Sequence, residues 1–309
     1  MKGYKGFRKD LTCSGFQYET GKIHEISGEL KICQNGFHFC KELKDCLRFY
    51  NKDDNRYFEV EVLGDVVDDL DGVKSVTNKI KLVKEAQIAP EMLIEMSKDE
   101  DPEIRTISVY RSDFPPDRLD QMWSDSHDSI RWRVAIMSCN PEVLERLSND
   151  ESAMVRGYVA ENKHTYEKTI SRLSKDETPD VRACAARNPN IPIEDLISLA
   201  EDFNCVVRCN AAQNERMPQD VLKRLAESKD NLVRFGVASN SNTPVETLVN
   251  LSKDDSLHVR KAVADHHSTP DDVLSELLKD SEADVRVGAV ENLESRGYDV
   301  LFSLKKKDL

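Results

Sequence analysis

The sequence predicts a small α+β N-terminal domain over residues 1–84, followed by an all-α solenoid of about eight 26-residue, two-helix repeats over residues 85–309. Three observations support this prediction. An arginine recurs every 25 or 26 residues beyond residue 100, apolar and polar residues alternate before residue 84, and aromatic residues make up only 6% of the chain. A fixed period of this length is typical of repeat proteins, in which each unit buries one face on its neighbours.

The first 84 residues show the period of two that is typical of strands. An Asn35-Gly36 pair between apolar runs indicates a hairpin turn. Residues 41–50 place Leu43, Cys46, Leu47 and Tyr50 on one helical face. We expect five or six strands and one helix. The segments with strand character are 15–19, 30–33, 56–62 and 76–82.

The repeat is clearest when its eight units are aligned on the arginine. These arginines are Arg105, Arg131, Arg156, Arg182, Arg208, Arg234, Arg260 and Arg286. Six residues before them stand Asp99, Asp125, Asp150, Asp176, Asp202, Ser228, Asp254 and Asp280. Eight arginines in a row could form a ligand ladder. Buried charges must be paired, however, so we expect a buried ladder of Asp–Arg pairs that sets the geometry of the repeats.

Each unit has the pattern of two short helices joined by tight turns. Apolar pairs with a spacing of three lie nine and twelve residues before the arginine, and proline precedes them in five units. Thr243-Pro244 and Thr269-Pro270 are typical of an N-cap followed by the first helical residue. An asparagine six residues after the arginine predicts a left-handed helix stop. We expect helices of about nine residues and a last, capping helix near residues 298–309.

These units resemble the leucine-rich repeat variant class and its HEAT-like relatives over about residues 88–295. The resemblance is carried by Asn188-Pro189, Pro192, Leu196, Leu199, Asp202, Val207-Arg208, Ala212 and Asn214. It implies that one helix of each pair is a tighter 3₁₀ helix. Some relatives carry an N-terminal iron–sulfur cluster, but the N-terminal cysteines here lack close CxxC spacing, and we do not extend the cluster to this chain.

Nearly all of residues 1–84 resembles an uncharacterised domain encoded by bacteriophages and prophages, through runs such as KGFRKDLTCSGFQYE and RYFEVEVLGDVV. This resemblance implies a phage or prophage origin. The order of a glycine-aromatic strand, a helix and a strand ending in Leu-Gly is also similar to ADP-ribosyltransferases. That similarity implies catalytic candidates at His38, Tyr50 and Glu61. The catalytic glutamate of such enzymes is expected near Asn78, where this chain has Asn-Lys.

The net charge of −13 is concentrated in the repeats. Residues 85–309 carry 29 Lys and Arg against 43 Asp and Glu, whereas residues 1–84 are nearly neutral. This acidic surface opposes nucleic-acid binding and favours another protein, in particular a basic one. No run is long enough for a membrane span, and no secretory signal is seen. We therefore expect reduced cysteines and a cytoplasmic location, in the host cell if the gene is phage-borne.

One variable helix face is bulky in the first two units, at Tyr110, Trp132 and Ile136. Either the N-terminal domain packs on this face, or a partner binds there. Two groups invite a metal reading: Cys33, His38 and Cys40 with Cys13 or Cys46, and His258, His266 and His267. Neither has the spacing of a standard site, so we expect no metal and no cofactor.

The leading functional hypothesis is a non-enzymatic scaffold that binds a protein, such as a host factor or a defence component. The alternative is an enzyme of ADP-ribosyltransferase type with its site in residues 1–84. DNA binding by the helical groove is disfavoured by charge. The sequence leaves homo-oligomerisation open.

Overall fold

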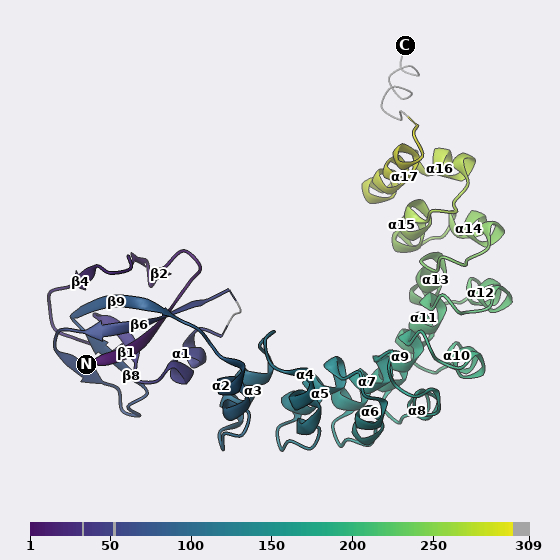
Figure 1. Ribbon diagram of the computed structural model, residues 1–309. Coiled ribbons are helices and arrows are strands. Elements are labelled where there is room, and N and C mark those ends of the chain that lie inside the picture. The colour runs from purple at the N-terminus through teal and green to yellow at the C-terminus, as the bar shows by residue number, and fades with distance from the viewer. Residues whose placement is uncertain (33, 52–53, 299–309) are drawn as a thin grey trace, which may run out of the picture. The chain divides into compact units, whose positions relative to one another are not determined.

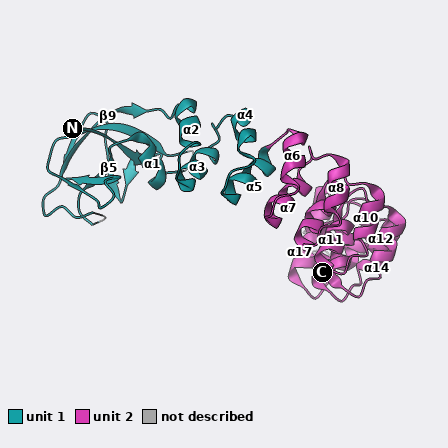
Figure 2. Cartoon of the chain, turned by 90° about the horizontal axis from the view of Figure 1, so that it is seen from below, with its two compact units in different colours: residues 1–137 teal, residues 138–309 magenta. Residues whose placement is uncertain are grey.

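The computed structural model describes residues 1–32, 34–51 and 54–298. The chain divides into two compact units, residues 1–137 and 138–309, coloured separately in Figure 2. Among the described residues, the strands and the first helices lie in the first unit, and the second unit contains helices only. Most of the predicted capping helix at residues 298–309, and Cys33, lie outside the described residues.

The N-terminal region is built on a seven-stranded antiparallel sheet with the order β4-β9-β6-β1-β5-β8-β7 (Figure 1). A two-stranded sheet, β2-β3, accompanies it. One helix, α1 (Leu43–Phe49), packs against β1 and β5. The strands are β1 (Lys2–Phe7), β2 (Thr12–Cys13), β3 (Phe16–Gln17), β4 (Ile23–Glu25), β5 (Phe37–Cys40), β6 (Arg56–Val62), β7 (Val66–Asp68), β8 (Lys74–Thr77) and β9 (Lys79–Ala86).

Among the strands that the sequence analysis missed is β1, which lies in the middle of the sheet between β6 and β5. Two glycines in β1 allow side chains from neighbouring elements to approach its backbone. A Cβ on Gly3 would lie 2.6 Å from the Phe39 ring, and one on Gly6 would lie 2.4 Å from the Tyr50 ring. The predicted strand over 56–62 is present as β6. The one predicted over 15–19 is reduced to the two residues of β3.

The core of this sheet is aromatic. Phe7 meets Tyr18 and Phe58 in edge-to-face contacts, with ring centroids 5.0 and 5.6 Å apart. Phe37, Val60, Ile80 and Leu82 belong to the same buried cluster. Such ring pairs add to the stabilisation that burial of apolar area already provides.

The remaining helices form pairs, as the repeat period predicts, so the fold class is confirmed. Within the first unit they are α2 (Pro90–Met96), α3 (Pro102–Val109), α4 (Pro116–Leu119) with the 3₁₀ helix η1 (Asp120–Met122), and α5 (Asp128–Met137). Among the described residues of the later pairs, no 3₁₀ helix replaces an α-helix. The implied alternation of α and 3₁₀ helices is therefore wrong for this chain.

In the second unit the two helices of each pair form two parallel rows. The first row is α6 (Pro141–Leu147), α8 (Glu167–Leu173), α10 (Ile193–Leu199), α12 (Gln219–Leu225), α14 (Val245–Leu251) and α16 (Asp271–Leu277). The second is α7 (Ala153–Glu161), α9 (Pro179–Arg187), α11 (Cys205–Gln213), α13 (Asn231–Ala238), α15 (Leu257–Asp265) and α17 (Ala283–Ser295). Figure 1 shows the second row along the inner side of a curved stack. Consecutive helices of this row contact each other.

Two cap assignments need correction. Pro244 is the N-cap of α14, and the helix begins one residue later than predicted. The Thr243 hydroxyl does not cap this helix, because it donates to the Val237 carbonyl oxygen 2.6 Å away. Thr269 makes the same contact with Val263. A proline at the N-cap sacrifices no helical hydrogen bond, since the N–H that it lacks would lie outside the helix.

The asparagines after the second-row helices do not stop them in a left-handed conformation. Asn188 has φ −65° and ψ 128°, and Asn214 has φ −67° and ψ 124°, which is extended backbone. Their side chains instead reach into the preceding unit. Asn214 Nδ2 donates to the carbonyl oxygens of Ala186 at 2.7 Å and Asn188 at 3.1 Å. The column therefore links units through buried hydrogen bonds, and this role explains the residue type.

Candidate functional site

The arginine column lies at the junctions between units. In every described unit, Nη1 of the arginine donates to the backbone oxygen of the residue six positions earlier, such as Asp176 for Arg182 at 2.8 Å. The guanidinium thus holds the turn before its own helix. This is the contact that a fork of several N–H donors suits best.

The carboxylate that the guanidinium meets belongs to the next unit, twenty residues further on. Arg182 Nε and Nη2 donate to the two carboxylate oxygens of Asp202 at 2.7 and 3.0 Å. The same bidentate geometry recurs in the pairs Arg105–Asp125, Arg156–Asp176, Arg234–Asp254 and Arg260–Asp280. The side chains in these five pairs are at most 17% exposed. Each pair therefore joins two consecutive units and is not contained within one.

Arg208 is the variant member of the column, because Ser228 stands where its carboxylate would be. Its Nη2 instead reaches Asp230 Oδ2 at 3.4 Å, and both side chains are more exposed than in the bidentate pairs. Arg131 is buried and holds the carbonyl oxygens of Asp125 and Ser126. Arg286, in the last described pair, holds those of Asp280 and Ser281.

The electrostatics of the column favour the charged forms. The hydrogen bonds from Arg182 lower the pKa of Asp202 against the opposing effect of burial, and Arg260 does the same for Asp280. Charge-assisted bidentate pairs are among the stronger hydrogen bonds in proteins. The arginine N–H groups are directed at the turn of their own unit and at the next unit. The column is therefore better suited to joining units than to binding a ligand.

A cluster of large side chains lies at the end of α3 and on α5 in the first unit. We call Tyr110, Trp132, Arg133 and Ile136 the aromatic cluster. The Tyr110 and Trp132 rings meet edge to face at 5.6 Å. The Arg133 guanidinium lies 5.1 Å from the centre of the Tyr110 ring. Tyr110 and Ile136 are exposed, and Trp132 is half-buried. The three residues singled out in the sequence therefore lie on a surface that remains accessible within this unit.

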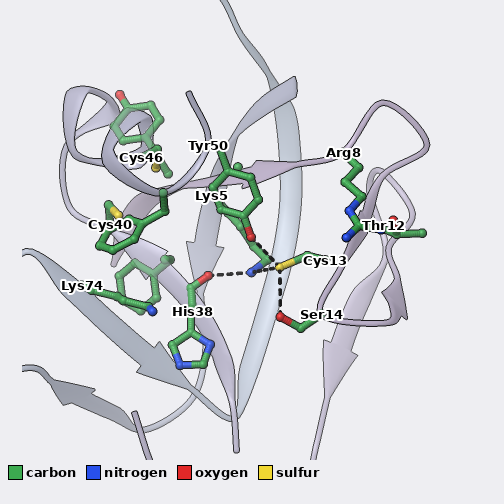
Figure 3. Close-up of a pocket in the computed structure, with 14 residues that line it drawn as sticks. Lys5, Arg8, Thr12, Cys13, Ser14, His38, Cys40, Cys46, Tyr50 and Lys74 are labelled. Carbon is green, nitrogen blue, oxygen red and sulfur yellow. Dashed lines mark hydrogen bonds between the residues drawn. The ribbon is translucent and has the colours of Figure 1, made fainter. Parts of the chain in front are cut away.

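A second candidate site is a cavity of about 410 Å³ in the N-terminal region (Figure 3). Its walls come from β1, β5, α1, β8 and the segment between β1 and β3. Lys5, Cys13, His38 and Tyr50 all line it. It is large enough for a small molecule.

Lys5 and Cys13 form the centre of this cavity. Lys5 is only 3% exposed, and its Nζ donates to the His38 carbonyl oxygen at 2.7 Å and to Cys13 Sγ at 3.3 Å. The Tyr50 hydroxyl lies 2.8 Å from the same sulfur. Figure 3 shows the ammonium and hydroxyl converging on the thiol. Lys5 also lies within 5.5 Å of the centres of the Phe7 and Tyr18 rings.

These contacts shift the ionisation of the groups around the sulfur. Burial acts to raise the pKa of Cys13, but the Lys5 charge and the hydrogen bonds from Tyr50, Lys5 and Ser14 outweigh it, so the pKa is lowered. Burial lowers the pKa of Lys5. Burial, with the nearby charges of Lys74 and Lys5, lowers the pKa of His38 to about 4. His38 is therefore neutral at pH 7.

Of the three catalytic candidates, the cavity brings together His38 and Tyr50 but leaves out Glu61. Glu61 is exposed on β6, where its backbone pairs with β1 and β9. Asn78 also lies outside the cavity lining and bonds to Asp65. The carboxylate that the ADP-ribosyltransferase similarity would require is absent from the described lining residues.

Among the described residues, neither of the two candidate groups forms a set of metal ligands. In the part of the chain that the structure describes, no group of three or more His, Cys, Asp or Glu residues could hold an ion. His266 is buried instead as a substitute for the column asparagine. Its Nε2 lies 2.9 Å from the Asn240 carbonyl oxygen, and its Nδ1 accepts from Ser268 N. Among residues 1–32, 34–51 and 54–298, no helix has the length and apolar character to cross a bilayer.

Sequence reasoning noted Cys13 only as a metal candidate and missed Lys5. The two residues and Tyr50 come from a strand, the next short strand and a helix cap, and no fixed spacing connects such positions. The available signal was weak: Lys5 shares a strand face with Gly3 and Phe7, which marks it as inward-pointing once β1 is recognised.

Residues 1–95 match a family described as a domain of unknown function, DUF7666. No curated protein matches the chain significantly. Among solved structures, a leucine-rich repeat variant with a novel repetitive motif is 27% identical over 66% of this chain and 81% of its own, with a TM-score of 0.45. The E. coli protein YibA is 20% identical over 67% and 93%, with a TM-score of 0.42. An engineered protein is 17% identical over 66% and 77%, with a TM-score of 0.35.

These three TM-scores lie below 0.5, so the overlays carry no argument about activity or partners. The helical repeat architecture rests on this chain's own helices and junctions. The family match is equally silent on activity. The phage origin and the ADP-ribosyltransferase similarity remain predictions.

Proposed function

We propose that the helical repeats are a scaffold that binds another protein, and that the aromatic cluster is an anchor for this partner. The observation that carries the proposal is the edge-to-face pair of the exposed Tyr110 and the half-buried Trp132, with Arg133 over the tyrosine ring. Tyr, Trp and Arg are the residue types that most often dominate binding energy at protein interfaces. The rings are held against each other before binding, which lowers the entropy lost on association.

The charge of the chain favours a basic partner. The excess of acidic residues over residues 85–309 attracts positively charged surfaces and repels nucleic acid. The resemblance of residues 1–84 to phage-encoded domains supports a host or defence protein as this partner. A cytoplasmic location fits such a partner.

The proposal is tested by affinity capture from bacterial lysate with three forms of the full chain. These are the wild type, the double variant Tyr110→Ala/Trp132→Ala and the control Phe203→Ala. Phe203 is a fully exposed aromatic residue in the second unit, far along the chain from the aromatic cluster. A relevant partner is captured by the wild type and the control but lost with the double variant.

The captured protein is then purified, and its affinity is measured by calorimetry. We expect the double variant to bind more weakly, with a dissociation constant about thirtyfold higher or more, as the loss of a hot-spot pair causes. Higher salt should weaken wild-type binding if the partner is basic. Equal affinity for all three forms, or capture of nothing by any of them, would refute the proposal.

A further inference from the structure

The N-terminal cavity has a strongly one-sided charge. Three cationic side chains line it, Lys5, Arg8 and Lys74, and none of its described lining residues is Asp or Glu. Its volume of about 410 Å³ is at the small end of ligand-binding pockets. A cavity of this size and sign selects a small anion over a neutral or cationic molecule.

The buried lysine needs a counter-charge, and the cavity offers few. Removing an ammonium from water costs several kcal/mol unless a negative group compensates for it. Of the described groups that contact Lys5 Nζ, the Cys13 thiol is the one that can ionise to an anion, since the other acceptor is a backbone carbonyl. Burial raises the pKa of Tyr50, so its hydroxyl stays protonated and can donate to the sulfur. The site is therefore built to hold a thiolate.

We propose that this cavity binds a small anionic electrophile and that Cys13 is the nucleophile that attacks it. The chemical class is a carboxylate- or phosphate-bearing molecule with an electrophilic carbon. A bond forms between Cys13 Sγ and this carbon while the bond from the carbon to its leaving group breaks. The leaving group departs with that electron pair, so no oxidant or reductant is required.

The other lining residues have separate roles in this reaction. Lys5 and Tyr50 are positioning residues that hold the sulfur and favour its anionic form. Lys74 and Arg8 supply the positive charge that attracts the anionic group of the ligand. This activity lies in the strand region and is independent of the protein-binding surface on α3 and α5.

The test compares two alkylating reagents on the reduced full chain: iodoacetate, which is anionic, and iodoacetamide, which is neutral. Both form a carbon–sulfur bond and release iodide. Peptide mass spectrometry gives the rate at Cys13, and the exposed Cys139 is the internal control. At pH 6.5, we expect the iodoacetate-to-iodoacetamide rate ratio to be about tenfold higher at Cys13 than at Cys139.

Three conservative variants test whether the residues of the cavity control the reactivity of Cys13 or whether its thiol is simply accessible to reagents. Tyr50→Phe keeps the ring that packs on Gly6 but removes the hydroxyl, so the pH midpoint of Cys13 alkylation should rise. Lys74→Met should lower the rate ratio at Cys13. Lys84→Met, an exposed lysine on β9 outside the cavity lining, should leave it unchanged.

Thermal melting checks that each variant is folded. Two results would overturn the proposal. Cys13 could react with both reagents no faster than Cys139 at pH 6.5. Alternatively, the preference for iodoacetate could persist when Arg8 and Lys74 are both changed to methionine.

Discussion

Arg182 and Asp202 are twenty residues apart and belong to different units, yet they form a bidentate ion pair with N–O distances of 2.7 and 3.0 Å. The same guanidinium holds the carbonyl oxygen of Asp176 in its own unit. One side chain therefore fixes the turn of one unit and the position of the next.

The first prediction concerns loss of one junction. Arg182→Ala should lower the free energy of unfolding by about 3 kcal/mol, because it leaves the Asp202 carboxylate without its partner in a poorly hydrated place. Arg187→Ala on the same helix is the matched control. Its pair with Glu161 is exposed, so the loss should stay below about 1 kcal/mol. Urea denaturation followed by circular dichroism measures both, and equal losses would contradict a junction role.

The second prediction concerns restoration of the missing carboxylate. Ser228→Asp should raise the free energy of unfolding by about 1 kcal/mol, because it places a carboxylate twenty residues after Arg208, as in the bidentate pairs. Ser228 Oγ already accepts from Asp230 N, as the column aspartates do, so the local turn should persist. When Arg208 is already changed to alanine, Ser228→Asp should no longer raise the free energy of unfolding, so the double variant Arg208→Ala/Ser228→Asp should be no more stable than Arg208→Ala. A gain that survives there would disprove the pairing.

The third prediction concerns pH. Burial lowers the pKa of His266, and the stacked His267 adds to this effect. The unfolded chain therefore binds the His266 proton more readily than the folded one. Neutral His266 therefore contributes fully to the free energy of unfolding above about pH 6.5, the ordinary pKa of histidine. This contribution is lost progressively as the pH falls below that value.

The variant His266→Asn should remove this pH dependence. Asparagine fits the column, where it can donate to Asn240 O and accept from Ser268 N as the histidine does. The wild type should lose more stability than the variant between pH 7 and 5, measured by urea denaturation. The pKa of His38 is lowered in the folded chain as well, but His38 is present in both proteins, so its effect on the comparison cancels. Parallel pH profiles would show that His266 is not the cause.

The fourth prediction compares two helical glycines. A Cβ on Gly236 would lie 2.7 Å from the Cys209 carbonyl oxygen, whereas one on Gly157 would meet its nearest neighbour, Cys184 Sγ, at 3.4 Å. Gly236→Ala should therefore destabilise the chain by about 1–3 kcal/mol, because backbone cannot move aside cheaply. Gly157→Ala should stabilise it by up to about 1 kcal/mol through helix propensity. Melting temperatures measure both, and a stabilised Gly236→Ala variant would show that α11 and α13 are not in tight contact.

The repeat is predictable from the sequence because the same contact has to form at every junction between units. Every unit must present the same donor at the same junction, so Arg182 has a counterpart in each of the other seven units. The sequence shows the asparagine column but not its role, since a helix-stop residue and a residue that bonds to the previous unit have the same spacing. Only the positions of Ala186 and Asn188 beside Asn214 distinguish the two.

The N-terminal site was much less predictable. Strand β1 contains two lysines and two glycines in six residues, which is a poor strand signal, and its place in the middle of the sheet follows from pairing with β6 and β5. His38 and Tyr50 were proposed through a resemblance and do line one cavity. The contact between Lys5 and Cys13 depends on the turn that joins their strands, which short-range patterns do not determine.

The junctions also bear on how the length of such a chain can change. The arginine reaches forward by twenty residues and the asparagine reaches back by about one repeat, so each internal unit offers the same two surfaces to its neighbours. Removing or duplicating one whole 26-residue segment of the gene would bring together surfaces that already match. Removing or duplicating a segment a few residues longer or shorter than one repeat would bring together surfaces that do not match. Recombination between the repeated stretches of DNA could therefore lengthen or shorten the stack without new contacts having to evolve.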